Sequence, residues 1–513
     1  MRGPLALPIH RAMARAVARG VLALLASLLP FTPALALEEV VLELPLLNSR
    51  FLLKVRELES AQALRAGSSD LAELDRASGG AVGRRLLALF QEPVPLVVSQ
   101  IADGSVGSPL LEQALLVVSS FGRLDDQPAD LTGQTLSQAL AQASRHGPPT
   151  LLNLIQAIPG RRVTINVAQA RAVAKRMVLQ RRQAERLLAT VPAVAAPLRR
   201  LDPGLPVQLR RVPLPVVHRP QPLELLVLEP TTGATGRLVL ISHGLWDRPE
   251  MFEGWGRLLA SRGYAVVLPR HPGSDSSQQR AVLTGAAPPP RPEELALRPL
   301  DLRAVIDAAG RLGLGAAVDG NRVVVLGHSW GATTALQLAG VRPTDTKLRR
   351  RCGDTTDPDR NLSWTLQCSW LGAVRQASQH DPRVIAVVAV SPPASLLFPR
   401  GTGADSSGRV LLVSGSRDWV VPPDPEAVTP MRWGRRLGNQ LVLVNGGDHF
   451  NLRPGAADDG GVLGALLLTW TERAFAAGEA VRPAADAPPL LTGDGWGSSL
   501  LPMAEVTGAL PPI

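Results

Sequence analysis

The sequence VVVLGHSWGATTALQLAG at residues 323–340 contains the strongest structural signal in the chain. Its β-branched run Val323–Leu326 predicts a buried strand, and ATTALQLAG predicts the helix that follows. Between them, Gly327-His328-Ser329-Trp330-Gly331 forms a G-x-S-x-G motif at the strand-to-helix junction. A serine on such a tight turn exposes its hydroxyl, and the glycines allow strand and helix to pack closely. The motif therefore predicts Ser329 as a nucleophile.

Two partners for this serine follow in the order acid, then histidine. The predicted strand in LLVSGSRD leads to Asp418, and LVLVNGGDHF places His449 just past the next strand. Open α/β sheets place their sites at the carboxyl ends of strands, so we expect Ser329, Asp418 and His449 to meet there. Asp424 and Asp448 are alternative acids. As the neighbour of His449, Asp448 should point its side chain away from the imidazole.

A fourth element precedes these three. Ser242-His243-Gly244-Leu245 follows the apolar run Leu238–Ile241, where enzymes with this nucleophile turn build half of an oxyanion hole. We expect the backbone N–H groups of Leu245 and Trp330 to be the donors. Each such donor is worth ~3 kcal/mol in the transition state. We interpret His243 as structural rather than catalytic.

Alternating strands and helices extend over residues 205–478 and predict an α/β domain with a doubly wound, mostly parallel sheet. The strand candidates are Leu223–Leu228, Leu238–Ile241, Ala265–Leu268, Val323–Leu326, Val384–Val390, Val410–Val413 and Leu441–Val444. Residues 37–204 predict a smaller, mainly helical domain with a short hairpin of Val40–Leu46 and Phe51–Val55. Residues 479–513 form a tail rich in proline and glycine, without periodicity.

The amino-acid composition argues against some classes of binding partner, nucleic acids above all. The chain has 513 residues and a net charge of +10, but its 54 basic and 44 acidic residues are interspersed, and no basic tail suggests nucleic-acid binding. The segment 167–189 predicts an amphipathic helix with a basic face, which either contacts an anionic membrane peripherally or, more commonly, is simply solvated. No metal or organic cofactor is expected, and the oligomeric state stays open.

Residues 1–36 read as a cleavable signal peptide. They combine a leader with four arginines, an apolar run of ten residues at Gly20–Leu29, and the small-x-small triplet Ala34-Leu35-Ala36. A membrane anchor is the alternative, but the run is shorter than the ~20 residues that span a bilayer. We therefore expect export, to a periplasm or to the outside. In an oxidising compartment Cys352 and Cys368 can form a disulfide, and two unpaired buried thiols are the alternative.

These motifs resemble the α/β-hydrolase superfamily. The sequence is most similar to exported bacterial esterases related to platelet-activating-factor acetylhydrolases and dienelactone hydrolases, which carry a helical N-terminal domain of unknown function. Besides Ser329, Asp418 and His449, the resemblance rests on residues 241–275 and 297–308 and on the cysteine pair. Two departures are Trp330, where a smaller aromatic residue is usual, and Ala332, which replaces a second glycine.

The resemblance implies hydrolysis of lipid or short acyl esters through an acyl-enzyme. Two other functions stay open at this point. An amidase or peptidase can use the same three residues, because fold and triad do not decide the substrate. A non-catalytic envelope binding protein is the second alternative, and the intact serine, histidine, aspartate and glycines argue against it.

Overall fold

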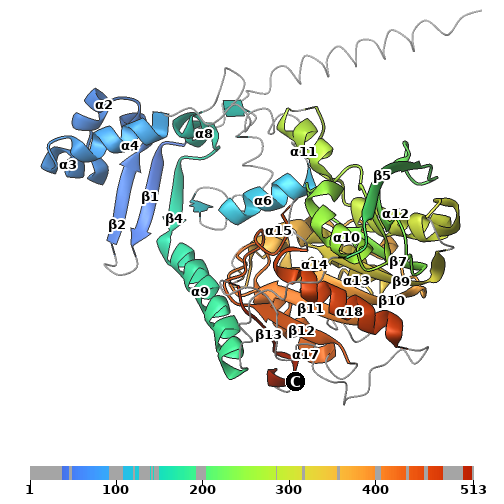
Figure 1. Ribbon diagram of the computed structural model, residues 1–513. Helices are drawn as coiled ribbons and strands as arrows, with labels where there is room; N and C mark the ends of the chain where they lie inside the picture. The colour runs from blue at the N-terminus through green and yellow to red at the C-terminus, as the bar shows by residue number, and fades with distance from the viewer. Residues whose placement is uncertain are drawn as a thin grey trace, which may run out of the picture.

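The computed structural model describes residues 37–44, 49–91, 108–119, 122–125, 139, 142–143, 150–191, 204–284, 286–314, 318–354, 357, 359–398, 406–434, 438–455, 460–477 and 501–510. Figure 1 shows a small N-terminal domain beside a larger C-terminal one. The predicted signal peptide 1–36 and residues 479–500 and 511–513 of the predicted tail lie outside the described residues.

The small domain contains a four-stranded sheet in the order β2-β1-β4-β3. The predicted hairpin is present as the antiparallel pair β1 (Glu39–Leu44) and β2 (Ser49–Lys54). The structure adds β3 (Gly122–Leu124) and β4 (Arg162–Asn166), and β4 lies parallel to β1. The helices packed around this sheet are α2 (Ala61–Arg65), α3 (Asp70–Ala77), α4 (Ala81–Gln91) and α8 (Leu151–Ala157).

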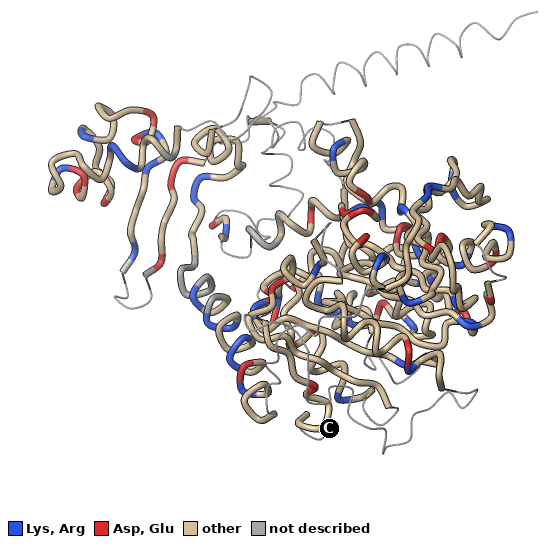
Figure 2. Tube along the Cα trace, viewed as in Figure 1, with Lys and Arg blue, Asp and Glu red and all other residues tan. Residues whose placement is uncertain are grey.

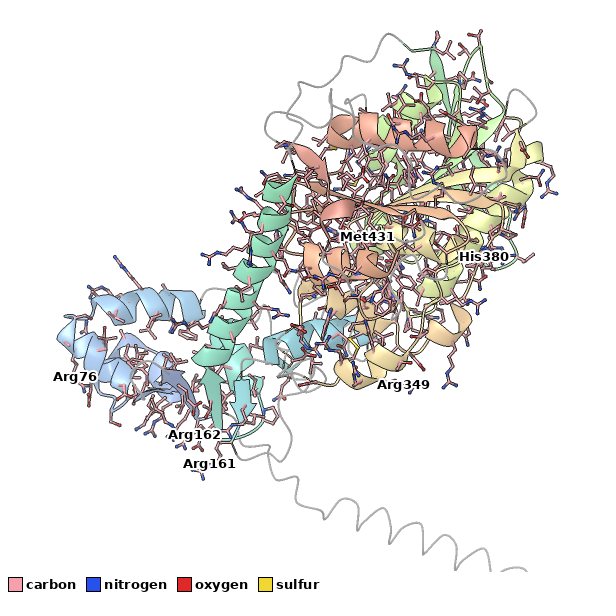
Figure 3. All side chains as sticks on the ribbon, turned by 90° about the horizontal axis from the view of Figure 1, so that it is seen from below. Arg76, Arg161, Arg162, Arg349, His380 and Met431 are labelled. Carbon is pink, nitrogen blue, oxygen red and sulfur yellow. A yellow bond between two sulfur atoms is a disulfide. The ribbon has the colours of Figure 1, made fainter. Side chains whose placement is uncertain are left out.

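Two helices from the N-terminal part pack against the large domain. The predicted helix after Ser108 is α6 (Pro109–Ser119), and the predicted basic helix is α9 (Val167–Thr190). Leu110, Ala184 and Leu188 are buried in the core of the large domain. Figure 2 shows the cations of α9, and Figure 3 shows this helix leaving the strand marked by Arg161 and Arg162 and running along the large domain. None of the described helices combines the length and apolarity that a bilayer crossing needs.

The large domain is built on a nine-stranded sheet in the order β13-β12-β11-β10-β9-β7-β8-β6-β5. The six strands from β12 to β8 pair in parallel, and the outer strands pair antiparallel. All seven predicted strands are confirmed, and β5 and β13 are additional. The strands are β5 (Val207–Leu214), β6 (Leu223–Pro230), β7 (Arg237–Ser242), β8 (Ala265–Pro269), β9 (Asp319–His328), β10 (Val384–Val390), β11 (Arg409–Gly415), β12 (Gln440–Val444) and β13 (Met503–Glu505).

Helices cover both faces of this sheet, which confirms the predicted doubly wound α/β architecture (Figure 1). On β9, Val323 and Val325 enter the core shared with α12 (Glu294–Ala308) and α13 (Trp330–Leu338). The alternate residues Val324 and Leu326 enter the opposite core, with α10 (Glu253–Ala260) and α18 (Gly464–Ala476). Because both faces are buried, the strands read as continuous apolar runs. The remaining helices are α11 (Ser276–Leu283), α14 (Thr346–Arg351), α15 (Leu362–Ser369), α16 (Pro423–Glu426) and α17 (Val428–Gly434).

The C-terminal boundary predicted at 478 needs a correction. Strand β13 pairs antiparallel with β12, with Leu443 opposite Ala504, and Val506 and Leu510 are buried in the core of the large domain. Residues 501–510 therefore belong to this domain. Such a strand escapes sequence prediction because three residues show no periodicity and its partner lies about sixty residues earlier.

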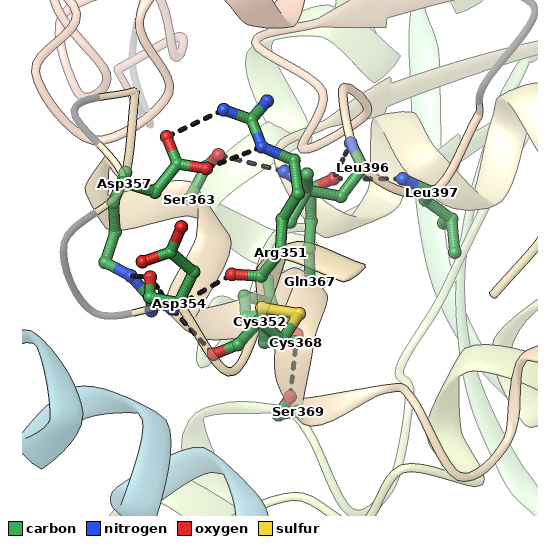
Figure 4. Close-up of a disulfide and its surroundings, with 12 residues drawn as sticks. Arg351, Cys352, Asp354, Asp357, Ser363, Gln367, Cys368, Ser369, Leu396 and Leu397 are labelled. Atoms are coloured by element: carbon green, nitrogen blue, oxygen red, sulfur yellow. Dashed lines mark hydrogen bonds and ion pairs between the residues drawn. A yellow bond between two sulfur atoms is a disulfide. The ribbon is translucent and has the colours of Figure 1, made fainter. Parts of the chain in front are cut away.

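The predicted disulfide is present. Cys352 follows α14 and Cys368 lies on α15, and their Sγ atoms are bonded with the Cα atoms 5.6 Å apart (Figure 4). The alternative of two unpaired thiols is therefore wrong for this structure. A closed loop of this length stabilises the fold by ~3 kcal/mol through the entropy of the unfolded chain.

Candidate active site

Ser329 occupies the predicted turn between β9 and α13. Its φ of 53° and ψ of −122° lie outside the conformations that non-glycine residues normally adopt. The two glycines of the motif are required by space, because a Cβ at Gly327 would overlap the backbone of Gly331 and a Cβ at Gly331 would overlap the backbone oxygen of Ser242. The motif thus places a serine with a strained backbone at the carboxyl end of a central strand. Residues with such strain are typically found at functional sites.

A hydrogen-bonded chain joins the three residues that the sequence predicts to meet. The Oγ of Ser329 lies 3.1 Å from Nε2 of His449, and Nδ1 of His449 lies 3.0 Å from Oδ2 of Asp418. The other carboxylate oxygen of Asp418 accepts hydrogen bonds from the N–H groups of Val420 and Val421, at 3.0 and 2.7 Å. Because both oxygens are occupied, the carboxylate is fixed in the orientation that holds the imidazole.

The two alternative acids have other partners. Oδ1 of Asp448 accepts the N–H groups of Phe450 and Asn451, both at 2.8 Å, so this carboxylate turns away from the imidazole as expected. Oδ1 of Asp424 accepts the hydroxyl of Thr429 at 2.6 Å. Asp418 is therefore the acid in contact with the histidine.

His328, the residue before the serine, supports the loop that carries the histidine. Its Nε2–H donates to the backbone oxygen of His449 at 2.9 Å, and its Nδ1 lies 3.8 Å from Asp247. Burial lowers the pKa of His328, so the ring is neutral at pH 7. Burial alone would raise the pKa of Asp247, but the ion pair with Arg453, whose guanidinium donates to Oδ1 at 2.7 Å, opposes this effect, and the pKa is lowered. The sequence did not predict this supporting role, because the G-x-S-x-G motif leaves the residue before the serine unspecified.

The two backbone amides predicted as oxyanion donors lie at the serine. Trp330 is the first residue of α13, so its N–H has no acceptor within the helix. The N–H of Leu245 makes no hydrogen bond to any described residue. A Cβ at Gly244 would lie 3.2 Å from Cβ of Ser329, which places this loop against the serine. Both amides are therefore available near the hydroxyl.

Arg298 on α12 holds this loop from behind. Its buried guanidinium donates to the backbone oxygens of His243 and Gly244 at 2.7 and 3.2 Å, and to Oγ and O of Ser274 at 2.9 and 3.2 Å. It also lies 4.4 Å from the ring centroid of Trp330. Burial lowers the pKa of Arg298 to about 10, which leaves it charged at neutral pH. A single cation thus positions both sides of the predicted oxyanion hole.

His243 has the structural role that the sequence suggests. Its Nδ1–H donates to the backbone oxygen of Gly244 at 2.8 Å, and its Nε2 accepts the N–H of His271 at 3.1 Å. Burial lowers the pKa of His243 well below its ordinary value. The neutral ring joins two loops through these hydrogen bonds, and neither bond involves Ser329.

A second Ser-His-Asp chain lies beneath the first. Oγ of Ser242 is 2.9 Å from Nε2 of His271, whose Nδ1 is 2.8 Å from Oδ2 of Asp301. Asp301 also binds His218 and Arg219. The three residues of this chain have no exposed surface, whereas Ser329 keeps 7% of its surface exposed. Because Ser242 is fully buried, no substrate reaches it, and we interpret this second chain as structural. Burial also lowers the pKa of His271 to about 4.

A cavity of about 210 Å³ opens beside Asp418. One wall comes from α9 and the other from the loop that follows β11. Its lining residues are Met177, Val178, Gln180, Arg181, Ser416, Arg417, Asp418, Trp419, Pro422 and Pro423. Within the described part of the chain, no group of three histidine, cysteine or acidic side chains is arranged to hold a metal ion.

Comparison with known proteins agrees with this architecture. The family model of the alpha/beta hydrolase fold matches residues 237–352, from β7 through the end of α14. The match includes Ser329 and the loop at Leu245 but ends before Asp418 and His449. None of the curated proteins matches the chain. The sheet order and this match together place the large domain in the α/β-hydrolase fold.

Proposed function

Starting from an α/β-hydrolase domain, we propose that the protein is a serine hydrolase that cleaves carboxylic esters through an acyl-enzyme. The observation that carries the proposal is the continuous hydrogen-bonded chain from Ser329 through His449 to Asp418. The strained backbone of Ser329 supports it, because strain at one buried serine between two required glycines is typical of a nucleophile turn.

Acylation starts with proton transfer. Nε2 of His449 takes the hydroxyl proton of Ser329 as Oγ attacks the ester carbonyl, and Asp418 holds the imidazole tautomer and stabilises its positive charge. The N–H groups of Leu245 and Trp330 donate to the developing oxyanion. His449 then gives its proton to the leaving alcohol, and Ser329 carries the acyl group.

Deacylation repeats these steps with water. His449 removes a proton from the water molecule as its oxygen attacks the acyl carbon, and the same two amides stabilise the second tetrahedral intermediate. Collapse of this intermediate returns the proton to Oγ of Ser329 and releases the acid. The residues present complete the cycle without a further group.

We propose lipid or short acyl esters as substrates, in line with the resemblance to acetylhydrolases and dienelactone hydrolases. Support comes from the apolar residues around the cavity beside Asp418. Met177 and Val178 on α9 are 43% and 47% exposed, and Trp419 is 52% exposed. Exposed apolar side chains at a cavity favour a ligand with an apolar part.

We also propose that the protein acts after export. The disulfide between Cys352 and Cys368 supports this location, because such bonds persist in oxidising compartments. Peripheral membrane contact through α9 stays a proposal. Arg176 and Arg186 of its basic face line a cavity against the large domain, so those two cations are directed to the protein itself.

The test is hydrolysis of p-nitrophenyl esters from acetate to palmitate by the wild type, by Ser329→Ala and by Ser242→Ala. We expect turnover by the wild type, a loss of up to ~10⁶-fold in kcat in Ser329→Ala, and continued turnover in Ser242→Ala. Paired rates on matched esters and amides separate an esterase from an amidase. Equal activity in wild type and Ser329→Ala would overturn the assignment of the nucleophile. No turnover of any ester or amide would overturn the hydrolase proposal and favour a binding protein.

A further inference from the structure

We propose that a cavity between α9 and the large domain, here called the anion pocket, binds an organic anion. The ligand class is a carboxylate or a phosphate monoester attached to a short apolar chain. The cavity measures about 430 Å³, within the range of small-molecule sites. Its lining residues are Arg176, Leu179, Gln180, Gln183, Arg186, Lys347, Arg351, Asp359, Ser395, Phe398, Asp424, Pro425, Thr429, Pro430 and Trp433.

Cations exceed carboxylates in this lining. The cations are Arg176, Arg186, Lys347 and Arg351, and the carboxylates are Asp359 and Asp424. Asp359 is already shared, because both Arg176 and Arg351 form ion pairs with it. Figure 4 shows the second pairing of Arg351, a two-point contact with Asp357 at 2.6 and 2.7 Å. These pairs leave Arg186 and Lys347 with no carboxylate within salt-bridge distance among the described residues.

Lys347 is the stronger indication of an anion site. Its Nζ donates to the backbone oxygen of Ser395 at 3.1 Å, and no other described residue accepts from it. An ammonium has three donors, so two remain for a ligand. The side chain is half-buried, and burial lowers its pKa. A partly buried charge without a counter-charge is costly, and a bound anion would remove that cost.

The nearest other carboxylate does not fill this role. Glu426 accepts hydrogen bonds from the N–H groups of Ala394 and Ser395 at 2.8 and 2.7 Å and from the hydroxyl of Ser363 at 2.6 Å. Its side chain is fully buried, and these bonds fix the turn whose carbonyl holds Lys347. Glu426 is therefore engaged by these hydrogen bonds, and no described carboxylate, including Asp359 and Asp424 of the lining, lies within salt-bridge distance of the Lys347 ammonium.

The lining also contains apolar side chains. They are Leu179 of α9, Trp433 of α17, Phe398, Pro425 and Pro430. Half of the surface of Trp433 is exposed. Cations and apolar side chains in the lining of one cavity fit a ligand with a charged head and a short apolar tail. A free inorganic ion would leave the apolar side chains uncovered.

The anion pocket neighbours the candidate active site without sharing its reacting groups. Gln180 lines both this pocket and the cavity beside Asp418, and the segment from Asp418 to Pro425 borders both. The binding proposal nevertheless goes beyond hydrolysis and does not depend on it, since Ser329 and His449 are absent from the lining. It can be tested in a protein without its candidate nucleophile.

The experiment is calorimetric titration of the full chain with octanoate, octyl phosphate and, as an uncharged control, octanol. Wild type and Ser329→Ala should bind at least one of the two anions with equal affinity, and octanol should bind more weakly by about tenfold or more, the equivalent of one charge-assisted hydrogen bond. The stronger of the two anions identifies the head group.

Two variants test the cations. Lys347→Met and Arg186→Met remove the charge and keep an unbranched, flexible side chain, and each should weaken anion binding by about tenfold. Arg349→Met is the matched control, because Arg349, which is labelled in Figure 3, lies on the same helix but pairs with Asp345, and neither residue lines the pocket. The proposal is overturned if neither anion binds, if octanol binds equally well, or if both charge-removing variants bind like Arg349→Met.

Discussion

His328 donates its Nε2 hydrogen to the backbone oxygen of His449 across 2.9 Å, although 121 residues separate the two in the chain. The residue before the candidate nucleophile therefore holds the loop that carries the candidate base. Their rings lie with centroids 4.8 Å apart. This contact couples the turn after β9 to the loop after β12, so the distance between Oγ and the imidazole depends on it.

Replacing His328 should impair the chemical step more than binding. In His328→Ala the loop at His449 loses its hydrogen bond, and small displacements of catalytic groups cost about 10 to 100-fold in rate. We expect kcat to fall in this range while KM changes little, in steady-state assays on the best ester. His380→Ala is the control, since His380, which is labelled in Figure 3, is exposed and contacts Ser407. A large rise in KM with unchanged kcat would contradict this account.

The choice between the acids can be tested by removing one charge at a time. Asp418→Asn keeps the shape but favours the wrong imidazole tautomer, and the expected loss in kcat is about 10⁴-fold. Asp424→Asn and Asp448→Asn should keep turnover near the wild-type level, because their carboxylates bind Thr429 and backbone amides. A loss in Asp424→Asn comparable to that in Asp418→Asn would show that the acid is wrongly assigned.

Space at the turn predicts a stability effect. A Cβ at Gly331 meets the backbone oxygen of Ser242, which has no flexible end that can move away. Gly331→Ala should lower the free energy of unfolding by about 3 kcal/mol or more. Gly310→Ala is the control, because nothing lies within 4 Å of a Cβ there. Urea unfolding of both variants distinguishes the two sites, and equal stability would refute the steric argument.

Buried histidines predict how stability depends on pH. The pKa of His271 is lowered by burial to about 4, and those of His243 and His328 are lowered too. The unfolded chain takes up these protons below its ordinary pKa of about 6.5, whereas the folded protein does not. The free energy of unfolding should therefore fall from pH 6.5 toward pH 4, by up to about 1.4 kcal/mol per pH unit for each histidine.

Urea unfolding at pH 7.5, 5.5 and 4.5 measures this dependence. In His271→Gln one of the three groups is gone, and the fall in the free energy of unfolding between pH 7.5 and 4.5 should be smaller by the contribution of one proton. An identical pH dependence in the wild type and His271→Gln would contradict the assignment of a neutral, buried His271 in the folded state.

The central sheet could be predicted because its strands are local signals. Runs such as Val384–Val390 are buried on both faces, so every residue is apolar and the strand is visible without its neighbours. Strands at the edges carry no such signal. The residues of β5 alternate between partly buried and exposed, and β13 has only three residues. Strand β4 lies directly before a strongly helical sequence and depends on pairing with β1, more than a hundred residues earlier.

Some residues of the candidate site could be predicted from the sequence, and others could not. Ser329, Asp418 and His449 could be proposed from the sequence, because each follows a recognisable strand and the topology of a parallel sheet brings such positions to one edge. Arg298 and His328 could not, because their partners are backbone oxygens that come close only in the folded chain. Asp301 is a similar case, since its contacts with His218, Arg219 and His271 join three separate segments.

By itself, the amino-acid sequence of this protein determined the α/β class, the turn of the candidate nucleophile and the chain order of the candidate site residues, because these depend on local patterns of apolar residues and glycines. The tertiary structure alone decided which acid contacts His449, which of two Ser-His-Asp chains retains exposed surface, and where α9 encloses a cationic cavity. The physical reason is that hydrogen-bond partners and burial depend on distances between segments far apart in the chain, and only packing sets those distances.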